Sequence, residues 1–305
     1  MTMLTIFLAV LVLLLLATVL APEAMTRYGL GAERWRSGLQ LGLAKVEGFD
    51  VPYLEGGQGE ALLLIHGFAG DKDNFTRIAR FLTPHYRVLI PDLPGFGDAS
   101  RDPGATYGMA DQVRRMHAML LQLGVQRLHI GGNSMGGFIA ALFAATHPEM
   151  VASVWLLDAA GTEASHETPL LRHYEATGQM PLLVKQEADF ANLLKATMAR
   201  PPYLPGFARK VLARRGMADF DLHTQILREL TDSPLLETQY THLDTPAFIV
   251  WGAQDQILSI DGAAAFHRLF PRGRVHVMDG IGHLPMVEAP AQTARDYLAF
   301  RRSLA

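Results

Sequence analysis

The segment with the clearest chemical potential is residues 132–136, which read Gly-Asn-Ser-Met-Gly. It joins an apolar run that predicts a strand, residues 127–130, to an apolar run that predicts a helix from residue 138 onward. A serine on such a sharp turn holds its hydroxyl above the sheet. Gly132 and Gly136 are needed because a side chain at either position would collide with a neighbouring element. Because the helix dipole favours negative charge beside it, Ser134 is predicted to be a nucleophile.

Two further polar residues follow strands of the same predicted sheet. Asp255 comes after the strand 247–251, and His283 comes after the strand 275–278. Carboxyl ends of parallel strands carry the functional sites of open sheets, so these side chains are expected near Ser134. His283 would take the serine proton, and Asp255 would orient the imidazole. Asp158, which ends the strand 151–157, is the alternative acid.

An oxyanion formed at Ser134 would require backbone N–H donors. The strand 61–65 ends in His66-Gly67-Phe68, where the glycine supplies flexible backbone. The N–H groups of Phe68 and Met135 are the predicted pair. His66 precedes Ser134 in the chain, so it is interpreted as a residue that fixes the loop rather than as the base.

Short apolar runs alternate with amphipathic helices beyond residue 43, which is typical of an α/β fold with a mostly parallel sheet. Buried strands are predicted at residues 61–65, 87–90, 127–130, 151–157, 247–251 and 275–278. Helices are predicted at 111–123, ending at Gly124, and at 291–304. The region 161–243 shows no strand pattern and is interpreted as a helical cap. The core is therefore expected to comprise residues 45–160 and 244–305.

The N-terminal residues 1–21 contain no charged side chain. As a helix this run would extend roughly 30 Å, so it predicts a single transmembrane anchor, with a cleaved signal peptide as the alternative. Residues 22–44 form the expected juxtamembrane segment. Its stretch 25–43 mixes arginines, aromatic residues and leucines, which suits either a helix at the lipid headgroups or a solvated linker. The arginines that follow the anchor favour a cytoplasmic body, and the signal-like ending favours the opposite side.

Composition excludes several classes of protein. With 27 Lys and Arg against 30 Asp and Glu there is no basic excess, so nucleic acid is not an expected partner. The absence of cysteine removes disulfides, thiolate metal sites and cysteine nucleophiles. The 12 histidines show no metal-ligand spacing, so neither a metal nor a cofactor is predicted. The runs 71–74 and 92–97 are interpreted as a helix cap and a tight turn.

With these residues in hand, the chain resembles the α/β-hydrolase superfamily over residues 45–305. The apolar N-terminus, together with the motifs around Ser134, Asp255 and His283, is similar to the membrane-anchored monoacylglycerol lipases of the α/β-hydrolase-domain 6 type. It is also similar to bacterial inner-membrane phospholipases A. The resemblance implies a serine hydrolase that acts on membrane lipid esters and releases fatty acid, on an inner-membrane anchor. The bacterial relatives also imply a catalytic body that faces the periplasm.

The predicted cap has two features that bear on substrate. Its apolar residues could line an acyl tunnel or simply pack the helices: Leu170, Leu171, Met180, Leu182, Leu183, Phe190, Leu193, Leu194 and Met198. Its basic cluster could touch anionic headgroups or be solvated: Arg200, Arg209, Lys210, Arg214 and Arg215.

Three hypotheses remain open from the sequence. The first is hydrolysis of lipid esters, the second is cleavage of small esters, lactones or carbon-carbon bonds by the same residues, and the third is a non-catalytic lipid-binding module. The sequence does not distinguish a monomer from a homodimer.

Overall fold

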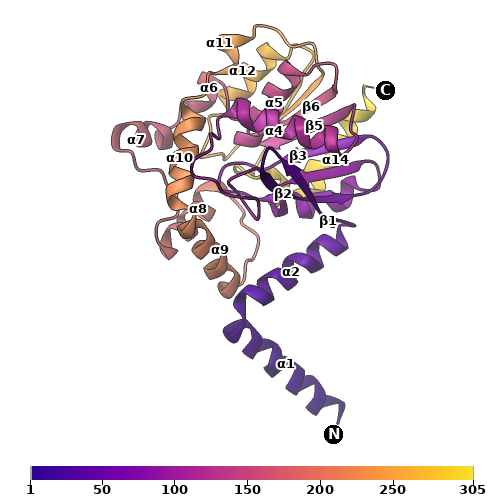
Figure 1. The fold of residues 1–305 in the computed structure, drawn as a ribbon, viewed down its shortest axis with the longest axis vertical. Coiled ribbons are helices and arrows are strands. Elements are labelled where there is room, and N and C mark those ends of the chain that lie inside the picture. The colour runs from indigo at the N-terminus through magenta and orange to yellow at the C-terminus, as the bar shows by residue number, and fades with distance from the viewer. Residues whose placement is uncertain (1, 305) are drawn as a thin grey trace.

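The centre of the molecule is an eight-stranded sheet (Figure 1). The computed structural model describes residues 2–304, apart from the side chains of residues 4, 10, 11, 13 and 14. The strands are β1 (Gln40–Val46), β2 (Phe49–Gly56), β3 (Ala61–Ile65), β4 (Arg87–Pro91), β5 (Leu128–Asn133), β6 (Val151–Leu157), β7 (Ala247–Gly252) and β8 (Arg274–Met278). Their order is β1-β2-β4-β3-β5-β6-β7-β8. Only the β1–β2 and β2–β4 pairs are antiparallel, which confirms the predicted mostly parallel sheet.

Three details of the sheet differ from the sequence predictions. Strands β1 and β2 were not predicted, and β1 occupies part of the stretch 25–43 that was expected to be a headgroup helix or a linker. Strand β8 was expected to be buried, yet Val275 and Val277 are exposed. Both β1 and β8 are edge strands, so each pairs with a neighbouring strand on one side only. Fewer elements pack over an edge strand, so fewer of its side chains need to be apolar or buried. The last residue of the predicted core, 305, lies outside the described residues.

Helices cover both faces of the sheet because its central strands are apolar on both sides. In β3, Leu63 and Ile65 face one core cluster and Leu62 and Leu64 face the other. Helices α4 (Met109–Gln122), α5 (Met135–Thr146) and α12 (Asp261–Leu269) pack in the first cluster. The second contains α3 (Thr76–Leu82), α13 (Pro285–Glu288) and α14 (Pro290–Arg302). Gly124 follows α4 with φ 70°, as its predicted role in ending that helix requires.

The region between β6 and β7 contributes only helices among the described residues, as the sequence predicted. They are α6 (Glu163–His166), α7 (Pro169–Thr177), α8 (Glu187–Thr197), α9 (Gly206–Ala218), α10 (Phe220–Thr231) and α11 (Leu236–Gln239). In Figure 1 most of this cap lies along one side of the sheet, and α9 approaches the N-terminal helices. The cap therefore lies between the sheet and the N-terminal helices.

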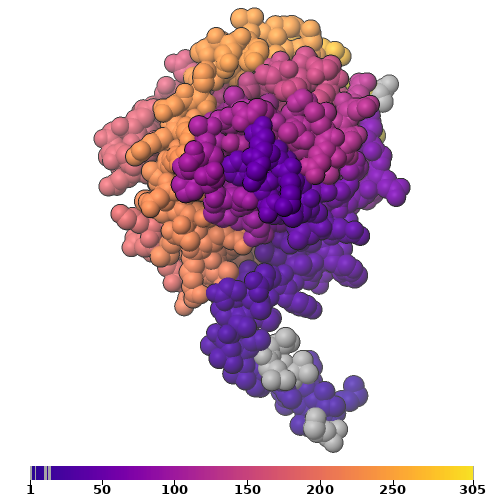
Figure 2. Space-filling view, viewed as in Figure 1, coloured from indigo at the N-terminus to yellow at the C-terminus, as the bar shows by residue number. Residues whose placement is uncertain are grey.

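Two helices precede the sheet, α1 (Met3–Leu20) and α2 (Pro22–Arg36). In Figures 1 and 2, α1 projects from the body. Its apolar side chains, such as Phe7, Leu15 and Val19, are exposed. Among the described residues, however, no helix combines the length and the apolarity needed to cross a membrane. The transmembrane anchor predicted for residues 1–21 is therefore not confirmed, and residue 1 lies outside the described residues.

An ion-pair network joins the loops beneath the cap. Lys72 is fully buried, and its Nζ contacts Asp92 Oδ2 at 2.5 Å and Asp98 Oδ2 at 2.7 Å. Asp98 also accepts from Arg215 of α9 at 2.9 Å. A buried ammonium is tolerated only when it is paired and hydrogen-bonded. Asp92, in the run 92–97 predicted as a tight turn, therefore also neutralises the charge of Lys72. Asp71 caps the short 3₁₀ helix η1 (Lys72–Phe75), which confirms the predicted capping role of the run 71–74.

The predicted basic cluster of the cap is partly neutralised within the molecule. Arg214 pairs with Glu23 of α2 at 2.9 Å, and Arg215 pairs with Asp71 and Asp98. Arg209 and Lys210 are exposed on α9. Two of the five cluster residues therefore hold the cap against α2 and the core.

Candidate active site

Ser134 occupies a strained turn between β5 and α5. Its φ is 56°, a left-handed value that is costly for a residue with a side chain. A Cβ at Gly132 would overlap the backbone of Gly136, and a Cβ at Gly136 would overlap the carbonyl oxygen of Ile65. Glycine is therefore required at both positions. The backbone N–H of Ser134 donates to Leu157 of β6 at 3.0 Å, which holds the turn against the sheet.

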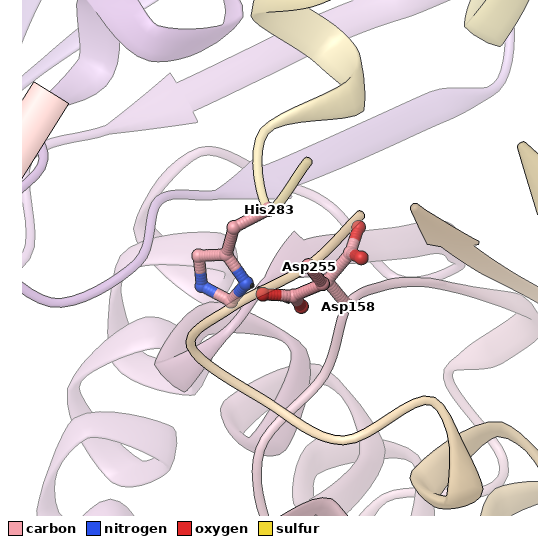
Figure 3. A group of neighbouring side chains, drawn as sticks. All are labelled: Asp158, Asp255 and His283. Atoms are coloured by element: carbon pink, nitrogen blue, oxygen red, sulfur yellow. Dashed lines mark hydrogen bonds and ion pairs between the residues drawn. The ribbon is translucent and has the colours of Figure 1, made fainter. Parts of the chain in front are cut away.

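His283 and Asp255 meet at the carboxyl edge of the sheet (Figure 3). The Nδ1 of His283 lies 2.8 Å from Oδ2 of Asp255. The other carboxylate oxygen of Asp255 accepts from the N–H groups of Ile257 at 2.8 Å and Leu258 at 3.2 Å. Both side chains are almost fully buried. This geometry leaves Nε2 of His283 as the nitrogen that can take a proton from a reacting group.

Asn133 connects the serine turn with the histidine loop. Its Nδ2 donates to the carbonyl of His283 at 2.8 Å and to the carbonyl of Leu157 at 3.1 Å. Among the hydrogen bonds of the described residues, none joins the hydroxyl of Ser134 to His283. Hydrogen bonds of this kind are often long before substrate binds, and the side chain of Asn133 already links the two loops.

Asp158, the alternative acid, lies close to the pair (Figure 3). One atom each of Asp158, Asp255 and His283 lie within 4.8 Å of one another. Oδ1 of Asp158 accepts from the N–H of Gly252 at 2.7 Å, and no hydrogen bond to the imidazole is formed. Asp255 is thus the carboxylate in contact with His283.

The predicted oxyanion donors both have free N–H groups. Among the described hydrogen bonds, no acceptor takes the backbone N–H of Phe68 or of Met135. The loop before Phe68 is fixed by His66, whose Nδ1 donates to the Gly67 carbonyl at 2.8 Å and whose Nε2 accepts from the Leu93 N–H at 3.0 Å. Burial lowers the pKa of His66, consistent with the neutral ring that this arrangement needs. Gly67 allows the loop to approach Ser134, since a Cβ there would lie 3.1 Å from the serine Cβ.

The cap contacts the predicted oxyanion loop through His223 of α10. Its ring stacks on Phe96 with centroids 4.9 Å apart and lies 5.6 Å from the ring of Phe68. Burial lowers the pKa of His223 to about 4, so the ring is neutral and acts as an aromatic surface. No local pattern in the sequence indicates a role for His223, because its partners Phe68 and Phe96 come from distant segments.

Glu288 is a second residue of the site that the sequence did not predict. Its Oε1 accepts from Gly282 N–H at 2.9 Å and from Leu284 N–H at 3.4 Å, the two neighbours of His283. Its Oε2 accepts from the N–H of Arg200 in the cap at 2.8 Å. Pro285 is a helix-start signal that could have placed Glu288 one turn beyond His283.

We expect Glu288→Ala to lower kcat for acyl transfer from p-nitrophenyl butyrate about 10- to 100-fold with little change in KM, because charge-assisted hydrogen bonds that orient the His283 loop are lost. Glu288→Gln, which keeps one acceptor, should lose less. Glu237→Ala is the matched control, since Glu237 accepts from the N–H of Glu163 within the cap. An unchanged kcat in a folded Glu288→Ala variant would rule out this positioning role.

Together these groups can perform nucleophilic acyl transfer. Ser134 can attack a carbonyl, His283 can move the proton, and two free N–H groups can bind the resulting oxyanion. Of the four non-glycine residues with positive φ among residues 2–304, three lie in or next to this site: Ala69, Ser134 and Asp158. Such clustering of backbone strain is common at functional sites.

Comparison with known proteins agrees with this geometry. A family model described as the alpha/beta hydrolase fold matches residues 60–290. Lipase 1 of Psychrobacter immobilis is 38% identical over 278 residues, covering 89% of this chain and 87% of that protein. Monoacylglycerol lipase ABHD6 of Mus musculus is 26% identical, covering 91% and 88% of the two chains. A crystal structure of a membrane phospholipase A, described as a bacterial virulence factor, superposes with a TM-score of 0.90 at 37% identity and covers 99% of each chain. The chain belongs to the α/β-hydrolase fold family.

Proposed function

We propose that this protein is a membrane-associated serine ester hydrolase that releases fatty acid from lipid esters through an acyl-enzyme intermediate. The observation that carries the proposal is the buried His283–Asp255 pair, which lies beside the serine turn, together with the free N–H groups of Phe68 and Met135. The names of the similar proteins, lipases and a phospholipase A, support the ester chemistry.

The mechanism follows from the roles that these groups can play. Ser134 Oγ attacks the ester carbonyl while Nε2 of His283 takes its proton, and the N–H groups of Phe68 and Met135 bind the oxyanion. Collapse breaks the bond to the alcohol oxygen, which receives the proton from His283. Water then attacks the acyl-enzyme while His283 takes its proton. The bond between the acyl carbon and Ser134 Oγ breaks, Ser134 Oγ receives the proton from His283, and the fatty acid leaves. Asp255 orients the imidazole and stabilises its charged form in both halves.

The proposed substrate is a lipid ester, and the cap supports this choice. Met180 and Met198 are buried, whereas Leu182, Leu183 and Phe190 are only partly buried. Leu170, Leu171 and Leu182 pack against the main core, so part of the apolar set predicted as a tunnel serves helix packing. The remaining partly buried side chains are flexible apolar groups suited to an acyl chain.

Membrane association is proposed through the N-terminal helices, with the catalytic body in the periplasm as the resemblance implies. Exposed apolar side chains on α1 would enter lipid. At the α2 and α9 end of the body, Tyr28 and Tyr203 are exposed together with the cations Arg209 and Lys210. Such aromatic and basic side chains suit the headgroup layer, and the Glu23–Arg214 pair links the two helices.

We expect Ser134→Ala to abolish ester hydrolysis and labelling by a fluorophosphonate while thermal unfolding stays close to that of the wild type. The substrate panel comprises phospholipids, monoacylglycerols, short p-nitrophenyl esters, a lactone and a vinylogous diketone. Preference for the lipids supports the proposal, and preference for the diketone or lactone would replace it with the alternative chemistry. A wild type that is neither labelled nor active on the panel would favour a non-catalytic lipid-binding module.

Asp255→Asn should lower kcat by about 10⁴-fold, because the amide leaves His283 in the wrong tautomer. Asp158→Asn should have a far smaller effect, since Asp158 makes no hydrogen bond to the imidazole. Steady-state kinetics on p-nitrophenyl butyrate measure both. If the two losses were exchanged, Asp158 would be the acid of the triad.

Deleting residues 1–21 should reduce activity on liposomes and leave activity on p-nitrophenyl butyrate largely unchanged, because α1 contains none of the proposed catalytic residues. Local concentration explains the difference: the intact chain holds the site near lipid, whereas the truncated one must adsorb through weak contacts. Equal loss on both substrates would assign α1 a role in folding, and equal retention would exclude a role in substrate access.

A further inference from the structure

Asp158 is a buried carboxyl group for which the proposed mechanism has no use. It lies at the end of β6 with φ 46°, and its backbone N–H donates to Val250 at 2.9 Å. The side chain is inaccessible to solvent. Oδ1 accepts from the Gly252 N–H, and Oδ2 is buried without a described partner. A strained backbone that holds an unsatisfied acid beside the triad calls for a physical reason.

The surroundings of the two carboxyl groups differ. Asp255 accepts three hydrogen bonds, one from the imidazole and two from the N–H groups of Ile257 and Leu258. Asp158 accepts one, from Gly252. Two negative charges within 4.8 Å of each other in a buried site repel strongly, so one group is expected to hold a proton. Asp255, whose carboxylate accepts more hydrogen bonds, is the group expected to keep the charge.

We propose that Asp158 is a positioning residue that stays protonated at neutral pH and donates its proton to the carboxylate of Asp255. The donated hydrogen bond would hold Asp255 in the rotamer that faces His283. It would also keep a second negative charge away from the imidazole, which would otherwise bind its proton too tightly to act as a base. The inference rests on the proposed function, because it assigns a support to the acid of that mechanism.

The charged groups that face Asp158 agree with this assignment. They are Asp255 after β7, His283 after β8 and Glu288 on α13. Burial raises the pKa of Asp158 well above its ordinary value, and the negative charge of Asp255 raises it further. The hydrogen bond from the Gly252 N–H lowers the pKa of Asp158, but the pKa stays above its ordinary value.

Thermal unfolding tests whether Asp158 holds a proton in the folded protein, and it does not require an active enzyme. A carboxyl whose pKa is raised by folding stabilises the protein fully below its unfolded pKa, and this contribution is lost as pH rises toward the folded pKa. The Tm of Asp158→Asn minus that of the wild type should therefore increase between pH 5 and pH 8, because the amide never ionises. Asp279→Asn, at an exposed aspartate, is the control and should show a constant difference. A constant difference for Asp158→Asn would overturn the proposal.

Kinetics test the donated hydrogen bond. Asp158→Asn can still donate to Asp255 and accept from Gly252, so kcat should stay within about 3-fold of the wild type. Asp158→Ala removes the donor and should lower kcat about tenfold with little change in KM. Equal losses in the two variants would overturn the positioning role. If the wild type proved inactive, the proposed function would fail while the pH dependence of Tm would still decide whether Asp158 holds a proton.

Discussion

The close backbone approach at the serine turn is the constraint on which the rest of the site depends. Gly132 and Gly136 let α5 begin directly against β3 and β5, and a side chain at either position would overlap a neighbouring backbone. This contact places Ser134 next to Gly67, so the proposed nucleophile and the loop with the proposed second N–H donor become neighbours. The strain at Ser134 is tolerated because its N–H and carbonyl groups are hydrogen-bonded to β6 and to the residues that follow it.

The same kind of contact joins the loops after β7 and β8. A Cβ at Gly252 would overlap the carbonyl oxygen of Gly282, so these loops pack backbone to backbone. The backbone that carries Asp255 and His283 is therefore held by direct contact between the two loops, and not by contacts between flexible side chains. Asn133 and Glu288 add hydrogen bonds to both flanks of the histidine loop. Preorganisation of this kind lowers the cost of reaching a reactive geometry.

The cap contributes to the geometry of the site as well as covering it. Its residue Thr197 accepts from the His283 N–H at 2.9 Å, and His223 packs beside Phe68. Helix α9 is in turn paired with α2 through Glu23 and Arg214. A continuous set of contacts thus runs from the N-terminal helices through the cap to the loops that carry the predicted catalytic groups. The positions of His283 and Phe68 therefore both depend on contacts with the cap.

The sequence by itself determined the alternation of strands and helices, the helical nature of the cap and the candidate residues Ser134, Asp255 and His283, because glycine spacing and strand ends are local signals. Tertiary structure decided which carboxyl contacts the imidazole, since Asp158 and Asp255 both follow strands and only packing separates them. It also decided the edge strands β1 and β8, and the support from Glu288. These depend on partners distant in the chain, whose proximity no local pattern encodes.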